Sequence, residues 1–317
     1  MFALTCTAAI VLQLSPGFML PWDVMNAMGE TVDALGQASR AGLRTGETIG
    51  PRGTIVWEDR FDEPGVIDAT NWRHDLGKGP NGDGWGNNEW QTYTDGAAHV
   101  GPDEAGVSRL VIPVKFHGDG ANPLYTSAKL LSKYSFTYGR VDIRAKVATT
   151  HGSWSAIWML PDDASYGGGV WPDIGEIDIM EHVGMDVGVV HGTIHTRAYN
   201  HMISTQLGRQ VRVDSLLTRL LRLLRLRGDR DWHIYTMKWT EDEIVWARDG
   251  LVYNRFGNDG TGDYRTWPFD QNMHLILNVA IGGNWGGQKG VDYDRMRNGD
   301  TDPGNVMEID WVTVSKV

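Results

Sequence analysis

The sequence predicts an all-β protein in which two sheets pack as a sandwich. Glycine occurs 40 times and tryptophan 14 times in 317 residues, and long segments with a 3.6-residue apolar repeat are almost absent. Short runs of alternating apolar and polar residues, separated by turn residues, are typical of strands. Because all-β domains often reach about 250 residues as one unit, we expect one large domain.

The composition also narrows the class of function. The single cysteine, Cys6, excludes an intramolecular disulfide framework and a thiolate zinc cluster. A net charge of −11 disfavours a nucleic-acid-binding protein. Tryptophan enrichment in a polar chain fits stacking on carbohydrate, although a core position is the commoner explanation for any one tryptophan.

The first 52 residues read as a leader and a linker. Residues 1–22 carry no charge, and residues 2–14 have the length of the apolar core of a secretory signal, but the first basic residue is Arg40. We therefore interpret residues 1–22 as a degenerate signal peptide or a disordered leader, too short and interrupted for stable membrane insertion. Residues 23–52 are polar and rich in small residues, as in a linker. The predicted location is secreted or at the cell surface.

Strands separated by turns follow from about residue 53 to residue 317, and we assign this range to one domain. Residues 125–130 and 136–147 alternate with a period of two and are predicted to pair as antiparallel strands. Residues 232–240 and 243–250 are predicted to form a hairpin, and residues 307–314 a terminal strand.

Residues 175–181 carry the strongest signal of function, because three carboxylates stand among apolar and β-branched residues. Strand alternation places Glu176 and Asp178 on one face, and Glu181 joins them only if a β-bulge near Ile179 and Met180 inserts one extra residue. The Cα atoms of Glu176 and Glu181 would then be roughly 13 Å apart. Their carboxyl groups would lie about 5–6 Å apart, which suits a retaining glycosidase better than an inverting one. Asp178 between them would share a proton and separate the two glutamate pKa values. A solvated acidic face or a calcium cluster is the alternative.

Aromatic and polar residues nearby are candidates for sugar contacts. Trp154 and Trp158 share a strand face, so at least one of them is expected at the floor of a cleft. Asn87 offers a donor and an acceptor for sugar hydroxyls, and turn formation explains it equally well. His191 and His195 lie four residues apart, but no zinc-binding spacing such as H-E-x-x-H is present.

Several motifs in the same order resemble glycoside hydrolase family 16. Glu-Ile-Asp-Ile-Met-Glu at 176–181 is similar to the E-x-D-x-x-E signature of its laminarinase-like endo-1,3-β-glucanases, and residues 84–93 and 267–287 are close to that family's pattern. The resemblance implies a two-sheet β-jelly-roll sandwich (concanavalin A-like) with a concave substrate cleft. It implies that Glu176 is the nucleophile, Asp178 its modulator and Glu181 the general acid/base.

The same resemblance assigns further residues. It favours Trp158 as the cleft floor, and it implies that Trp171 and Trp285 stack on sugar and that His195 hydrogen-bonds Glu181 or the sugar. It also implies a structural calcium ion at Asp310, although calcium requires six to eight oxygen ligands. No cofactor is expected for catalysis.

The predicted function is endo-hydrolysis of β-1,3-glucan with retention by a monomeric enzyme. The alternatives are a mixed-linkage β-glucanase, an agarase- or carrageenase-like enzyme, and a non-catalytic lectin-like sandwich. Enzymes that act on sulfated polymers need basic residues to pair the sulfates. A lectin has no need of three adjacent carboxylates.

Residues 209–230 depart from the family pattern. They contain seven arginines and two aspartates, a local charge of +5, which leaves −16 on the rest of the chain. This balance favours a neutral glucan as substrate. We interpret 209–230 as a basic Leu/Arg insertion, poorly ordered or arising from a local change of reading frame, and the alternative is a helix that docks on an anionic surface.

Overall fold

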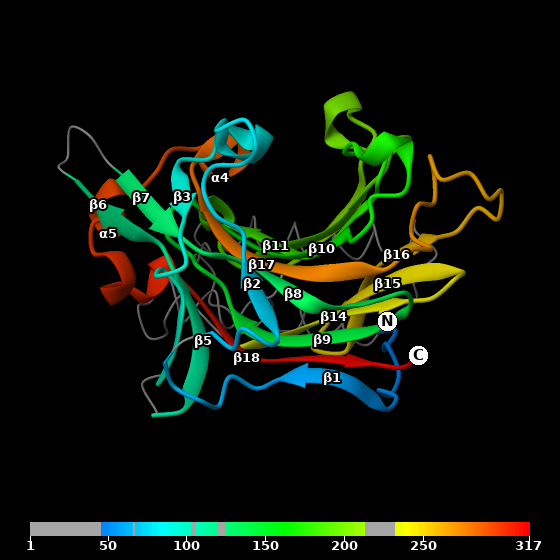
Figure 1. Ribbon diagram of the computed structural model, residues 1–317, viewed down its shortest axis with the longest axis horizontal. Coiled ribbons are helices and arrows are strands. Elements are labelled where there is room, and N and C mark those ends of the chain that lie inside the picture. Colours follow the sequence, from blue (N-terminus) through cyan, green and yellow to red (C-terminus); the bar gives the residue numbers. More distant parts are fainter. Residues whose placement is uncertain (1–45, 66, 103–105, 119–123, 213–231) are drawn as a thin grey trace, which may run out of the picture.

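The alternating runs fold into two antiparallel sheets that pack face to face. The computed structural model describes residues 46–317 apart from 66, 103–105, 119–123 and 213–231 (Figure 1). The predicted leader and most of the predicted insertion therefore lie outside the described residues. The two-sheet sandwich predicted from the sequence is confirmed.

The first sheet contains the C-terminal strand near its centre. In spatial order its strands are β16 (Leu251–Gly257), β15 (Glu243–Arg248), β14 (His233–Trp239), β9 (Gly139–Lys146), β18 (Val306–Ser315), β5 (Ser108–Pro113) and β4 (His99–Pro102), and β1 (Ile55–Asp59) also pairs with β18. The predicted hairpin is confirmed, because β14 pairs with β15.

The second sheet carries the acidic strand at its middle. In spatial order its strands are β13 (Leu207–Arg212), β12 (Val189–His195), β11 (Glu176–Val183), β10 (Ser153–Pro161), β17 (Met273–Ile281), β8 (Lys129–Phe136) and β2 (Trp72–His74). A small third sheet contains β3 (Gln91–Tyr93), β7 (Leu124–Ser127) and β6 (Lys115–His117). Figure 1 shows that the second sheet is strongly curved, with chain segments rising at both ends of its concave face.

Two predictions about strands are corrected here. The runs 125–130 and 136–147 do not pair with each other. The first run is divided between β7, which pairs with β3 and β6 in the third sheet, and the start of β8, which pairs with β17 in the second. The second run contains β9, which pairs with β14 and β18 in the first sheet. The turn between β8 and β9 carries the chain from one sheet to the other, and alternation alone cannot reveal this. The basic segment also begins inside regular structure, because Arg209 and Arg212 belong to the edge strand β13, which pairs with β12.

The core lies between the two sheets and is apolar. Ile177 and Ile157 of the second sheet and Ile143, Met237 and Trp239 of the first are fully buried in it. The helical elements are short, namely η1 (Gly84–Asn88), η2 (Gly167–Gly169), η3 (Gly184–Asp186), η4 (His201–Ile203), α4 (Gly283–Gly286), α5 (Tyr293–Met296), η5 (Gly299–Thr301) and η6 (Pro303–Asn305). Within the described ranges, no helix is long and apolar enough to cross a membrane.

Candidate active site

The acidic strand β11 contains the predicted bulge. Opposite β10, Trp158 pairs with Asp178 and Ile157 pairs with Met180, so Ile179 is skipped. The register with β12 shifts in the same interval, between Asp178 and Glu181. Ile179 and Met180 are consecutive and both lie in the core. The extra residue returns Glu181 to the face that Glu176 and Asp178 share, as the sequence predicted.

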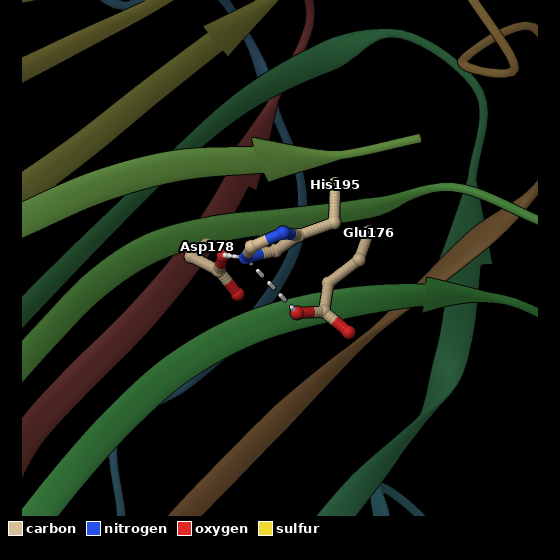
Figure 2. A group of neighbouring side chains, drawn as sticks. All are labelled: Glu176, Asp178 and His195. Carbon is tan, nitrogen blue, oxygen red and sulfur yellow. Dashed lines mark ion pairs between the residues drawn. The ribbon is translucent and has the colours of Figure 1, made fainter. Parts of the chain in front are cut away.

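Glu176, Asp178 and His195 converge on the concave face of the second sheet (Figure 2). The Nε2 atom of His195 lies 3.4 Å from Oδ2 of Asp178 and 3.9 Å from Oε1 of Glu176. Glu176 and Asp178 also interact through a hydrogen bond between their carboxyl groups. Within the described part of the chain, no arginine or lysine forms an ion pair with Glu176 or Asp178. His195 is the one ion-pair partner that these two acids have there.

Burial without a strong cation raises all three carboxyl pKa values. Burial raises the pKa of Glu176 to about 8, and repulsion from Asp178 adds to this. Burial likewise raises the pKa of Asp178 to about 7. The pKa of Glu181 is raised well above its ordinary value by burial and then by repulsion from Asp178. The raised pKa of Glu181 favours its protonated form, which a general acid requires.

Two tryptophans hold the two glutamates. Trp171 Nε1 donates to Oε2 of Glu176 over 3.0 Å, and Trp154 Nε1 donates to Oε1 of Glu181 over 3.0 Å. Trp171 was predicted to stack on sugar, and the structure also makes it an orienting donor. The sequence makes Trp154 a candidate for the cleft floor together with Trp158, but no local signal predicts its hydrogen bond, because Glu181 lies on another strand.

His195 lies beside Glu176 and Asp178 rather than beside Glu181, and its alternative contact with the sugar stays a prediction. The Cα atom of His195 is paired in register with Glu176, whereas His191 is paired with Glu181. The His195 ring also lies 5.8 Å from the Trp171 ring and 5.3 Å from the His201 ring, centroid to centroid. The register explains the difference, because the residue opposite Glu181 is His191, four residues along β12 from His195.

The other predicted sugar-binding residues lie around this centre. Trp158 pairs with Asp178 across the strands, and its Nε1 donates to Oδ1 of Asn278 over 2.7 Å. Trp285, in α4, contacts Trp154 edge-on with ring centroids 5.3 Å apart. Asn87, in η1, donates to Oε1 of Glu89 over 3.1 Å. These residues are brought to the concave side of the second sheet, and their contacts with a sugar stay predictions.

Sequence reasoning missed a buried charged cluster beside Trp158. Lys129 is 6% exposed, and its Nζ atom lies 3.0 Å from Oδ2 of Asp75 and 3.6 Å from the ring centroid of Trp85. Glu89 is 9% exposed and accepts a hydrogen bond from Gln91 over 2.6 Å. Burial lowers the pKa of Lys129 and raises that of Glu89. The sequence signal that could have revealed this cluster is Lys129 itself, a lysine at the start of an apolar strand segment.

Asp310, the predicted calcium ligand, forms ion pairs with two arginines. Its Oδ1 lies 2.7 Å from Nη1 of Arg109, and its Oδ2 accepts from Arg144. Two guanidinium groups neutralise the carboxylate and repel a divalent cation. Among the described residues, the one cluster with the ligand types and spacing for a metal ion is Glu176, Asp178 and His195. The calcium site stays a prediction.

Comparison with known proteins agrees with this geometry. The chain matches the model of glycosyl hydrolases family 16 over residues 87–312. It is 46% identical over 248 residues to a beta-glucanase of Rhodothermus marinus, covering 76% of this chain and 80% of that protein. A glucan endo-1,3-beta-glucosidase of Cryptopygus antarcticus is 33% identical over 248 residues, covering 75% of this chain and 84% of that protein.

A solved structure supports the same conclusion. The X-ray structure of the laminarinase from Rhodothermus marinus superposes with a TM-score of 0.70 at 42% identity, covering 84% of this chain and 98% of that one. The jelly-roll form of the sandwich is thereby confirmed. Fold and site together define a glycoside hydrolase. The chain belongs to glycoside hydrolase family 16.

Proposed function

We propose that the enzyme cleaves internal bonds of β-1,3-glucan with retention of configuration at the anomeric carbon. One observation carries this proposal: three carboxyl groups with raised pKa values share one face of a bulged strand, and a tryptophan orients each glutamate. The relatives named above, a beta-glucanase and an endo-1,3-beta-glucosidase, support glucan as the substrate.

In this mechanism Glu176 and Glu181 act in two steps. Glu181 donates its proton to the glycosidic oxygen as the Glu176 carboxylate attacks C1 and forms a glycosyl-enzyme ester. Glu181, now ionised, then takes a proton from water, which attacks C1 and releases Glu176. Burial and Asp178 raise the pKa of Glu176, and His195 and the Trp171 N–H partly offset this rise, which favours the carboxylate that the first step needs.

Asp178 separates the roles of the glutamates. Its negative charge raises the pKa of both neighbours, and its hydrogen bond with Glu176 lets these two carboxyls share a proton. Once Glu176 is esterified, its charge is gone, and the repulsion acting on Glu181 falls. The loss of the Glu176 charge thereby promotes the change of Glu181 from acid to base.

The surrounding charges favour a neutral polymer. In the described ranges, no lysine or arginine forms an ion pair with the catalytic triad, by which we mean Glu176, Asp178 and Glu181. Lys129 lies beside Trp158 and is paired with Asp75. A sulfated substrate would require unpaired basic groups. We further propose that the enzyme acts as a monomer on polysaccharide outside the cell or at its surface, where such polymers occur.

The test compares substrates and then variants. We expect reducing ends from laminarin, fewer from mixed-linkage lichenan, and none from agarose or carrageenan, and NMR should show the β-anomer as first product. Glu176→Ala and Glu181→Ala should each lower kcat by about 10³-fold or more. Azide should yield an α-glycosyl azide with Glu176→Ala and a β-glycosyl azide with Glu181→Ala. An α-anomer from the unaltered enzyme, or exchanged azide products, would overturn the mechanism.

A further inference from the structure

The catalytic strand is contacted from behind, through the core, by side chains of the first sheet. Trp246 of β15 donates from Nε1 to the backbone carbonyl of Asp178 over 2.8 Å. Tyr253 of β16 donates from its hydroxyl to the carbonyl of Ile179 over 3.5 Å. Both acceptors belong to the bulge that brings the three carboxylates together. Trp246 is fully buried and Tyr253 is 9% exposed, so both bonds lie away from bulk water.

A third donor holds the strand opposite the bulge. Asn254 of β16 donates from Nδ2 to the carbonyl of Gly192 over 3.0 Å. Gly192 of β12 is the one residue that faces the two bulged residues, since Asp178 pairs with Thr193 and Glu181 pairs with His191. The three bonds therefore hold both sides of the irregular pairing, and they all come from one hairpin of the other sheet.

A second bulge makes this arrangement possible. Trp246 pairs with Asn254 and Ala247 pairs with Val252, which leaves Tyr253 as an extra residue in β16. Consecutive strand residues normally point to opposite faces, but Tyr253 and Asn254 are both buried and both reach the second sheet. A bulge in the first sheet thus matches the bulge in the catalytic strand.

Gly192 provides the space for the donors. A Cβ atom at position 192 would lie 2.6 Å from Cδ1 of Trp246 and 2.7 Å from the Tyr253 hydroxyl oxygen. Any side chain there would push both donors away from the bulge. The two bulges and the glycine therefore form one packed unit, which we call the bulge support: Gly192, Trp246, Tyr253 and Asn254.

We propose that Trp246 and Tyr253 are positioning residues, which fix the bulge of β11 so that Glu181 keeps the spacing from Asp178 and Glu176 that hydrolysis needs. They do not touch the substrate, because they lie on the core side of the strand. The inference rests on the proposed function, since it gives the bulge support a purpose in that reaction. It adds that the geometry of the active site in the second sheet depends on side chains of the first sheet.

Trp239 supplies a matched control for the test. It is also fully buried on the first sheet, and its Nε1 donates to the backbone carbonyl of Phe269 over 3.0 Å, away from the bulge. Trp246→Phe and Trp239→Phe thus remove the same group and the same kind of hydrogen bond, and similar losses of melting temperature are expected. Tyr253→Phe has a control in Tyr235→Phe, because the Tyr235 hydroxyl is buried and has no hydrogen-bond partner among the described residues.

The decisive readouts are kcat and its pH profile on laminarin, measured well below each melting temperature. We expect Trp246→Phe to lower kcat about tenfold or more with little change in KM, and to displace the pH profile, because Glu176, Asp178 and Glu181 titrate differently once the bulge moves. Trp239→Phe should keep the parent kcat and profile. Equal kcat and pH profiles for these two variants would overturn the proposal. If Trp246→Phe does not fold, the Tyr253→Phe and Tyr235→Phe pair decides by the same criterion.

A second measurement needs no substrate and separates this proposal from the function. The pH dependence of unfolding stability reports the titration of the triad directly. It should change in Trp246→Phe and stay unchanged in Trp239→Phe, even if the unaltered enzyme were inactive on every glucan tested. Parallel stability profiles for the two variants would reject the positioning role, whereas inactivity of the parent would reject only the proposed function.

Discussion

The two sheets hold buried aspartates in opposite ways. Asp142 of the first sheet and Asp178 of the second are each 3% exposed. Asp142 accepts hydrogen bonds of 2.8 Å from both Nε and Nη2 of Arg140, and one of 2.7 Å from the Thr236 hydroxyl. Asp178 instead faces two other acids and a histidine, and within the described ranges its Oδ2 atom has no hydrogen-bond partner.

The comparison shows that burial alone does not mark a functional acid. The same side chain at the same depth is structural where a guanidinium and a hydroxyl satisfy it, and reactive where they are missing. Sites of this second kind oppose folding, because a charged group loses its hydration without full compensation. Stability and activity should therefore respond in opposite directions when the two aspartates are changed.

The largest expected effect is on stability, at Asp142. Asp142→Asn removes the charge that pairs with Arg140, a side chain only 12% exposed, and leaves the guanidinium without its counter-ion. Loss of one partner of a buried pair costs about 3 kcal/mol. We expect urea unfolding to report a loss of this size with kcat unchanged. A variant of parent stability would show that the pair contributes nothing.

Asp178→Asn should do the reverse. The amide cannot share a proton with Glu176 or repel Glu181, so we expect kcat to fall about 10- to 100-fold, with a displaced pH optimum. The fold should be no less stable at neutral pH, because a poorly compensated charge has been removed. An unchanged pH–rate profile would make Asp178 a structural residue.

The sign of the pH effect on stability follows from the raised pKa of Asp178. The folded pKa of about 7 exceeds the value in the unfolded chain, so the folded protein binds more protons between these two values. The contribution of Asp178 to stability therefore falls as pH rises from about 4 to about 7, and is constant above that. Asp178→Asn should match the stability of the parent near pH 4 and exceed it at pH 8. Thermal unfolding at the two pH values measures this gap, and a constant gap would contradict the assignment.

The sequence predicted the active strand well because its evidence is local. The phase of Glu181 against Glu176 and Asp178 requires one extra residue, and the bulge lies at Ile179 and Met180 as expected. What the sequence could not predict depends on contacts between distant strands. The Trp154 bond to Glu181, the shifted partner of His195 and the sheet change after Phe136 all follow from register and chain path, which alternation does not encode.

The smallest expected effect concerns Asp310, where the family resemblance and the ion pairs make opposite predictions. A calcium ion bound to the folded state would raise the melting temperature with calcium concentration and make it fall with chelator. Arg109 and Arg144 instead predict no response, since a cation at Asp310 would have to displace both guanidinium groups. We expect the parent melting temperature to be the same in EDTA and in millimolar calcium, with magnesium as the control for ionic strength.

Asp310→Asn should lower stability by about 1–2 kcal/mol in either buffer, a value reduced because Arg144 is 32% exposed. If calcium stabilises the parent but not Asp310→Asn, the carboxylate is a metal ligand, and the distinction between the two sheets would then rest on Asp142 alone.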